Sequence, residues 1–249
     1  MTETVRYERR GPVAWVTIDR PEARNAINAE VREGLFDAAA RFNEDDAAVL
    51  VLTGSGDVAF CAGADLKEMS SIALEVPPPD FLPVFGRTIP VEKLTIAAVN
   101  GVAYAGGFLL SQMCDLCVAA DHARFAITEV KVGRGAPWAA PLPWLVPPRV
   151  AMELLVTGDP LSAARAFDVG LVNRVVPLSQ LHDAAQELAE TIAANAPLSV
   201  AAAKRTVYLG MTAPYAEADA IWEPVYLSAD AQEGPRAFAE KRRPRWQGR

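Results

Sequence analysis

The centre of the chain, residues 95–113, reads TIAAVNGVAYAGGFLLSQM. Its β-branched and apolar beginning, Thr95–Val99, predicts a strand that is buried on both faces. A turn at Asn100 and Gly101 follows, and beyond a second turn at residues 106–107 the apolar residues recur at helical spacing. The uncharged run 94–114 has about the length that a bilayer core demands. Its glycines and polar side chains favour a strand, a glycine turn and a helix in a protein core, and no membrane span is expected.

Strands and helices alternate on both sides of this centre. Val13–Ile18 and Val49–Gly54 predict strands, and Asn28 is the expected N-cap of a helix that ends near residues 43–46. Two more short strands are predicted over Leu116–Ala120 and Arg124–Thr128. This alternation is typical of a layered α/β fold.

The C-terminal third is predicted to be helical, apart from one short strand over Val172–Val176. The expected helices cover residues 150–156, 162–169, 179–194, 198–209, 214–228 and 233–242. Two earlier stretches, 69–93 and 135–148, are too rich in proline for a continuous helix. We expect the first to be a lid or ligand loop. The second, with Trp138 and Trp144, is expected to form an irregular apolar wall or to pack in the core.

The composition limits the classes of function. The chain has 249 residues, of which 51% are hydrophobic, and a net charge of −7, which disfavours binding to nucleic acid. Three cysteines and the absence of an apolar leader predict a reduced, cytoplasmic protein. With two histidines there is little material for a histidine triad or a metal site. The motif Cys114-x-x-Cys117 is expected to be two buried apolar side chains.

Two turns between strand and helix carry the candidate chemistry. The first is Ala62-Gly63-Ala64-Asp65, where Asp65 is the expected helix cap, and the second is Ala105-Gly106-Gly107. Free N–H groups at two converging helix starts would form an oxyanion hole, in which each donor lowers a barrier by roughly 3 kcal/mol. Taken alone, each turn is better explained as a tight turn that needs glycine.

In this order, the segments resemble the enoyl-CoA hydratase/isomerase (crotonase) family over nearly the whole chain. The similar segments are an opening turn, the two oxyanion turns, a catalytic stretch and a later signature, at residues 20–26, 60–66, 97–107, 114–133 and 157–172. The resemblance implies an α/β fold with a crotonase-like spiral of ββα units over residues 1–195. It implies a helical C-terminal trimerisation region over residues 196–249, in homotrimers or hexamers. It also implies acyl-CoA thioester substrates, with coenzyme A as part of the substrate and neither a further cofactor nor a metal.

The resemblance also assigns catalytic roles. The N–H groups of Ala64 and Gly106 would hold the thioester oxygen while an enolate forms, and Glu129 would be the acid and base. Hydratases of the family have a second glutamate where this chain has Leu109, which can neither hold nor protonate water. Pro137 stands where many hydratases have a glycine, and proline has no N–H to offer a water molecule.

Both departures favour a single-carboxylate proton shuttle of the Δ3-Δ2-enoyl-CoA isomerase type. Isomerases of the family resemble this chain at the same positions, where they have leucine and the sequence Ala-Pro-aromatic. Such a shuttle requires an apolar pocket that raises the pKa of Glu129. Two alternatives remain open. One is an enoyl-CoA hydratase (a lyase) with an unidentified water-holding group, and the other is a catalytically silent acyl-CoA binding protein.

The substrate-binding residues follow from the same resemblance. Ala62, Asp65, Leu109, Pro137 and Trp138 are expected to bind the substrate. Phe238 and Lys241 look like a family pair that contacts coenzyme A, and Arg24 is expected near its phosphates. Residues 236–249 carry six Lys or Arg against one Glu, so their local charge is +5. The other explanation of this charge is an exposed basic tail.

Overall fold

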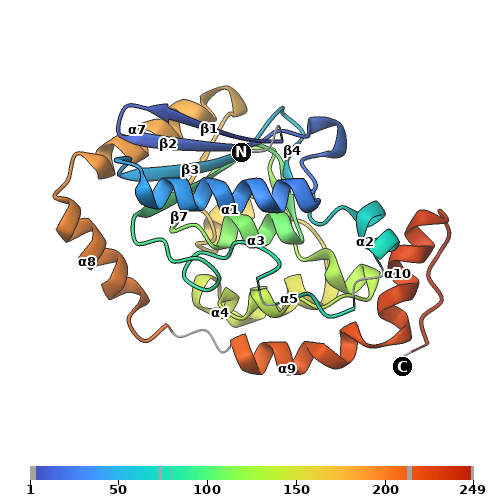
Figure 1. Ribbon diagram of the computed structural model, residues 1–249. Helices are drawn as coiled ribbons and strands as arrows, with labels where there is room; N and C mark the ends of the chain where they lie inside the picture. Colours follow the sequence, from blue (N-terminus) through green and yellow to red (C-terminus); the bar gives the residue numbers. More distant parts are fainter. Residues whose placement is uncertain (1–3, 73–74, 79, 212–214, 248–249) are drawn as a thin grey trace.

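The computed structural model describes residues 4–72, 75–78, 80–211 and 215–247 (Figure 1). Several residues of the predicted segments lie outside this range, among them Pro79 of the proline-rich stretch, Pro214 at the start of a predicted helix, and Arg249 of the basic terminus. The predicted boundary between residues 195 and 196 falls between two helices, α7 and α8.

The larger sheet has six strands in the order β1-β2-β3-β5-β7-β10. Their bounds are Val5–Arg10, Val13–Ile18, Val49–Gly54, Leu94–Val99, Leu116–Ala120 and Arg174–Val176. Only the edge strand β1 runs antiparallel to its neighbour; the other pairs are parallel. Strand β3 is buried along its whole length, as its continuous apolar sequence predicts.

The smaller sheet has four short strands in the order β4-β6-β8-β9, over Ala59–Cys61, Val102–Tyr104, Arg124–Ala126 and Leu161–Ser162. Strand β3 leads to β4 and then to helix α2 (Leu66–Ile72), and β5 leads to β6 and then to α3 (Gly106–Gln112). These repeats are the expected ββα units. The predicted strand over 124–128 is too long, because a 3-10 turn, η2 (Thr128–Val132), begins where β8 has ended.

Helices cover both faces of the larger sheet. Helix α1 (Ala29–Glu44) buries Val31, Leu35 and Phe42 against β1 and β2. As predicted, Asn28 caps it by accepting a hydrogen bond of 3.0 Å from the N–H of Val31. Helix α7 (Leu181–Ala193) covers the opposite face, so the sheet is buried on both sides.

All six predicted helices of the C-terminal third are present. They are α5 (Pro148–Thr157), α6 (Ala163–Asp168), α7, α8 (Pro197–Tyr208), α9 (Tyr215–Tyr226) and α10 (Ala229–Ala239), and they are preceded by a short α4 (Leu142–Leu145). The last helix begins earlier than the predicted 233, because the Ser228 side chain accepts a hydrogen bond from the Ala231 N–H. It also ends earlier than 242, because Lys241 has a left-handed φ of 52°. Among the described residues, no helix is both long and apolar enough to cross a bilayer.

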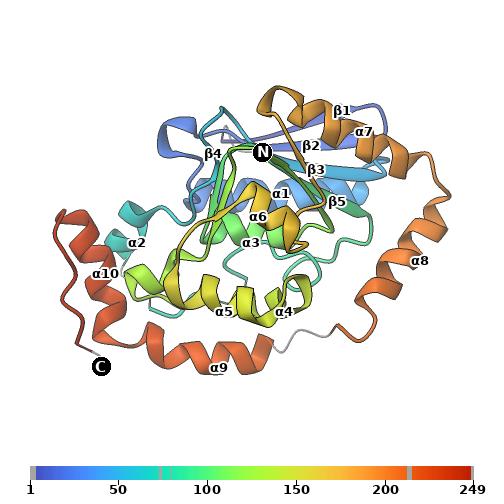
Figure 2. The ribbon, with the colours of Figure 1, turned by 180° about the vertical axis from the view of Figure 1, so that it is seen from behind.

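The last three helices differ in how they contact the rest of the chain. Figures 1 and 2 show α8 standing apart from the sheets, with α9 and α10 returning to the side of the molecule that carries α2. Helix α8 is anchored through Lys204, whose Nζ donates to an Asp115 carboxylate oxygen at 2.9 Å. Tyr208 donates to the other oxygen of Asp115 at 3.0 Å. Helix α10 packs on α2 and η2, so the last helix lies at the side of the molecule, next to the helix that follows the first oxyanion turn (Figures 1 and 2).

Candidate active site

A largely apolar cavity of about 360 Å³ lies where the two oxyanion turns meet η2, η3 (Pro137–Ala139) and α9. Seven of the eleven predicted site residues line it: Ala62, Ala64, Gly106, Leu109, Glu129, Pro137 and Trp138. The proline-rich stretch supplies a further wall, including Pro77, Phe81 and Leu82. The expectation of a ligand loop in this stretch therefore agrees with its position.

The two turns present their N–H groups at neighbouring points of the cavity wall. A methyl group added at Gly106 would lie 3.8 Å from the backbone nitrogen of Ala64, so the two donors are close together. Gly106 is the first residue of α3 and its N–H has no acceptor within that helix. A short β-bridge joins Ala64 to Ile27. Its two hydrogen bonds run from the Ile27 N–H to the Gly63 carbonyl oxygen and from the Asp65 N–H to the Ile27 carbonyl oxygen, so the Ala64 N–H takes no part in it.

Small residues allow this close approach of the two turns. Gly63 has φ +100° and a Cβ there would lie 2.8 Å from that of Ala105, which itself has φ +51°. Gly107 packs on the first turn so closely that a Cβ would lie 2.0 Å from the carbonyl oxygen of Cys61. Both turns are thus held in backbone conformations that are unusual or sterically restricted.

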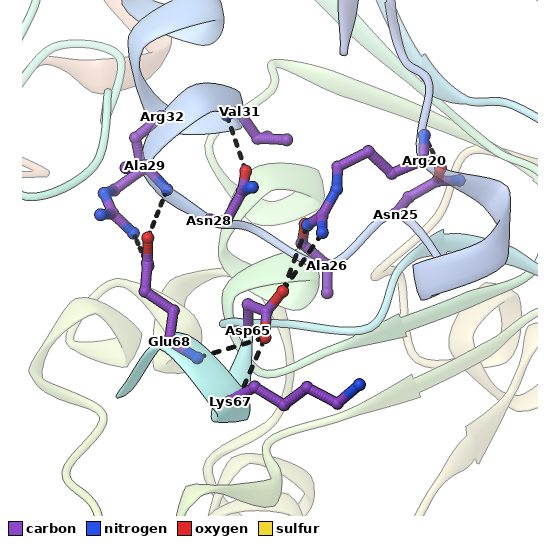
Figure 3. Close-up of polar contacts among 10 residues, drawn as sticks. All are labelled: Arg20, Asn25, Ala26, Asn28, Ala29, Val31, Arg32, Asp65, Lys67 and Glu68. Carbon is purple, nitrogen blue, oxygen red and sulfur yellow. Dashed lines mark hydrogen bonds and ion pairs between the residues drawn. The ribbon is translucent and has the colours of Figure 1, made fainter. Parts of the chain in front are cut away.

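A polar network fixes the helix that follows the first turn (Figure 3). Asp65 accepts hydrogen bonds from the N–H groups of Lys67 and Glu68, as its predicted capping role requires, and forms an ion pair of 3.3 Å with Arg20. Glu68 accepts from Arg32 at 2.7 Å and from the Ala29 N–H at 2.8 Å. Asp65 therefore positions the start of α2 and is not among the described residues that line the cavity.

Glu129 supplies a carboxyl group to the cavity. It lies on η2, directly after β8, and its Oε2 atom is buried without a hydrogen-bond partner in the described part of the chain. Burial raises its pKa from 4.5 to about 8, a rise that hydrogen bonds from its own backbone and from the Trp138 side chain limit. The apolar surroundings that a proton shuttle requires are therefore present, with Leu109 on the same cavity wall.

Arg24, Phe238 and Lys241 are not brought into the cavity. All three side chains are exposed, and Phe238 keeps 59% of its surface accessible. The carbonyl oxygen of Arg24 accepts a hydrogen bond from the Ala62 N–H at 3.1 Å, so this residue lies beside the first turn. Part of the basic charge of the terminus is used within the fold, because Arg236 and Arg242 both pair with the buried carboxylate of Glu233.

Several cavity residues were not predicted from the sequence. Arg134 follows η2 and is 5% exposed, and Tyr226 of α9 is buried beside it. Arg87 and Asp219 form an ion pair of 2.6 Å that joins the proline-rich stretch to α9. Arg134 has a sequence signal: it is the only charged residue between Lys131 and Arg149. Arg87, Asp219 and Tyr226 come together only when α9 packs against the cavity.

The three cysteine thiols are not among the described residues that line the cavity. Cys61, Cys114 and Cys117 are free and buried, and burial raises the pKa of Cys61 and of Cys117 to about 12. The burial of Cys114 and Cys117 confirms the prediction for that motif. Within the described ranges, no group of three or more His, Cys, Asp or Glu side chains is placed to hold a metal ion.

The raised pKa of Glu129 predicts a pH-dependent cost to stability. The carboxyl ionises near 4.5 in the unfolded chain and near 8 in the folded protein, so the folded state binds the extra proton between these values. Stability should therefore fall as pH rises from about 4.5 to about 8, by a few kcal/mol at 1.4 kcal/mol per pKa unit. Urea unfolding of the wild type and Glu129→Gln at pH 5.5 and 8.5 measures this term. An equal pH dependence for both proteins would contradict it.

Comparison with known proteins agrees with this architecture. Residues 8–249 match the family model described as enoyl-CoA hydratase/isomerase. A carnitinyl-CoA dehydratase of Salmonella paratyphi A is 39% identical over 264 aligned residues, with both chains covered in full. The crystal structure of a carnitinyl-CoA hydratase from Mycobacterium avium is similar with a TM-score of 0.89 and 40% identity, again over the whole of both chains. An enoyl-CoA hydratase from Mycobacterium tuberculosis H37Rv has a TM-score of 0.75 and 43% identity over 99% of each chain.

The spiral of ββα units, with paired turns and a carboxyl group at one cavity, defines an enzyme of the crotonase fold. The chain belongs to the enoyl-CoA hydratase/isomerase family. The resemblance found in the sequence motifs is thereby confirmed, and so is the fold class. The two turns, the Glu129 segment and the start of α3 line one cavity.

Proposed function

We propose that the protein transfers a proton at the carbon next to the thioester of an unsaturated acyl-CoA, with Glu129 as the single acid and base. The observation that carries this proposal is one buried carboxyl with a pKa of about 8, in the same cavity as the paired turns of Ala64 and Gly106. A carboxyl with such a pKa can both accept and return a proton near neutral pH.

In the proposed reaction, the carboxylate of Glu129 removes a proton from the α carbon of a 3-enoyl thioester. Negative charge develops on the thioester oxygen, where the N–H groups of Ala64 and Gly106 stabilise it. The protonated Glu129 then returns the proton to the γ carbon, and the double bond moves from position 3 to position 2. Leu109 and Pro137 provide neither a second acid nor a donor for water, which favours isomerisation. No cofactor is needed, because coenzyme A is part of the substrate.

The decisive experiment is deuterium exchange in D2O. The proposal predicts incorporation at the α carbon of a bound acyl-CoA, together with conversion of a 3-enoyl-CoA to its 2-enoyl isomer. The kcat/KM of this conversion should rise with pH and level off above about 8, because the free enzyme must present the carboxylate form of Glu129. Tight binding without exchange would instead identify a silent acyl-CoA binding protein.

A second candidate is hydration or dehydration of an acyl-CoA. The names of the relatives favour it, since a carnitinyl-CoA dehydratase and a carnitinyl-CoA hydratase match the chain over its full length. Glu129 could remove the α proton and return it to a departing β-hydroxyl group. Dehydration of a 3-hydroxyacyl-CoA that is faster than isomerisation of the matching 3-enoyl-CoA would support this candidate and contradict the first.

We also propose a homotrimer, or a hexamer of two trimers, in the cytoplasm. Helix α8 buries no side chain in the single chain, and Leu198, Val207 and Leu209 are exposed to 86%, 65% and 83%. Contact with other copies of the chain would bury these side chains. Light scattering should give about three or six times the chain mass of 26.7 kDa. A monomer at micromolar concentration would contradict the assembly. The three buried, free cysteines support a reducing compartment.

A further inference from the structure

One buried carboxylate holds the end of the chain against the last helix. After α10, the segment 240–247, here called the tail, runs back beside that helix (Figures 1 and 2). Glu233 of α10 is 3% exposed and accepts hydrogen bonds from the guanidinium groups of Arg236 at 2.7 Å and Arg242 at 2.5 Å. The same carboxylate accepts the backbone N–H of Arg245 at 2.8 Å. Because charge-assisted hydrogen bonds are strong, Glu233 fixes the course of the tail.

Helix α10 and the tail both lie directly against η2, the turn that carries the proposed acid and base. A Cβ at Gly133 would lie 2.6 Å from the carbonyl oxygen of Asp230 and 3.1 Å from the Cζ3 atom of Trp246 in the tail. A Cβ at Gly234 of α10 would lie 2.0 Å from the carbonyl oxygen of Val132. Two glycines therefore allow a contact between η2 and the chain end that has no room for a side chain.

The same turn fixes the backbone of Glu129. Gly133 ends η2 with a left-handed φ of 67°, and its N–H donates to the carbonyl oxygen of Glu129. The Arg134 N–H donates to that oxygen as well, at 2.9 Å. A shift of Gly133 is thus transmitted to Glu129 through two backbone hydrogen bonds. Such a shift matters for proton transfer, since a displacement of about 1 Å can cost 10²-fold in rate.

From these contacts we propose that Glu233 is a positioning residue: it holds the tail so that Trp246 packs on Gly133, and thereby keeps the Glu129 carboxyl in place for proton transfer. Glu233 is not among the described residues that line the cavity, so it acts through η2. The catalytic part of this inference rests on the proposed function, whereas the contact between the tail and η2 can be tested without it.

Amide hydrogen exchange, measured by mass spectrometry, tests that contact in the absence of substrate. In Glu233→Gln, a neutral amide replaces the carboxylate that pairs with two arginines. We expect peptides that cover residues 128–135 to exchange at least fivefold faster in this variant than in the wild type. Trp246→Ala should have the same effect, because it removes the indole from Gly133 and leaves α10 unchanged. Wild-type exchange in both variants would overturn the inference. Should Glu233→Gln fail to fold, Trp246→Ala decides in its place.

The chain offers a matched control for each variant. Glu240→Gln removes a carboxylate that pairs with Arg242 as well, but whose side chain is 52% exposed, so its loss should matter little. Trp144→Ala removes an indole of α4 that is 43% exposed and is not among the described residues that line the cavity. Both controls should show wild-type exchange over residues 128–135. An equal increase in the controls would mean that η2 responds to any loss of stability, which would contradict the proposed role of Glu233.

The effect on catalysis is measured per binding site, with the sites counted by isothermal titration of hexanoyl-CoA. We expect Glu233→Gln to lower kcat for deuterium exchange at the α carbon about tenfold, with KM within twofold of the wild type. A wild-type kcat per site would overturn the positioning role, because a merely less stable protein loses sites and not rate. Weaker binding of free coenzyme A with an unchanged kcat would also overturn it, since the tail would then bind coenzyme A. If the wild type exchanged no proton, the proposed function would fail together with the catalytic role, while amide exchange would still decide whether the tail holds η2.

Discussion

Replacement of Glu129 by glutamine should lower kcat for the proton transfer by a factor of about 10² to 10⁴, because the amide can neither accept nor return the proton. Affinity for a saturated acyl-CoA should change by no more than a few-fold, since glutamine has nearly the same shape and the Ala64 and Gly106 turns are untouched. Deuterium uptake at the α carbon should fall in parallel with isomerisation. The two rates are measured by mass spectrometry and by absorbance of the 2-enoyl thioester.

Glu153→Gln is the matched control for this variant. Glu153 lies on α5 and is exposed, so its replacement by glutamine changes the charge in the same way without altering the cavity. Wild-type rates are expected for it. A Glu129→Gln protein that isomerised within tenfold of the wild type would show that another group moves the proton, and the single-carboxylate scheme would then be wrong.

The sequence predicts the central sheet well because its strands are long apolar runs. Val49–Gly54 is buried throughout and Leu94–Val99 from Thr95 onward, and a short apolar run rich in β-branched residues is typical of a central strand. Strand β1 was missed because its exposed positions carry Arg6, Glu8 and Arg9, which hide the buried alternate residues Val5 and Tyr7. Strand β9 has two residues and exists only because β8 offers it an edge. No local pattern can indicate a strand of that length.

Some residues of the candidate site could be predicted from sequence motifs, and others depend on tertiary packing. Ala64, Gly106 and Glu129 belong to contiguous motifs, so the resemblance indicated them before their geometry was known. Tyr226 and Asp219 reach the cavity from α9, roughly ninety residues beyond Glu129 in the chain, and their place depends on how the C-terminal helices pack. Contacts such as Gly135 against Trp222, where a Cβ would lie 2.9 Å from the indole, fix that packing. The periodicity of apolar residues predicts the helix α9 but not the surface of the protein against which it packs.

Replacement of Gly107 by alanine should strongly destabilise the fold. The added Cβ would lie 2.0 Å from the carbonyl oxygen of Cys61, which is backbone and cannot turn aside. Overpacking of this kind costs about 3 kcal/mol or more of unfolding free energy, since either α3 or β4 must shift. Both oxyanion turns adjoin this contact, and a displacement of about 1 Å can cost 10²-fold in rate. Urea unfolding and the isomerase assay measure the two losses.

The neighbouring glycine provides the control, because Gly106→Ala adds the same methyl group one residue earlier. There the Cβ meets the Cδ1 atom of Ile27 at 3.1 Å, at the end of a flexible side chain that can move. The unfolding free energy of Gly106→Ala should therefore stay within about 1 kcal/mol of the wild type, since alanine also favours the first turn of α3. If both variants were equally stable, the contact between Gly107 and Cys61 would not be what holds the two turns together. In that case the network of Asp65 and Arg20 would have to align them instead.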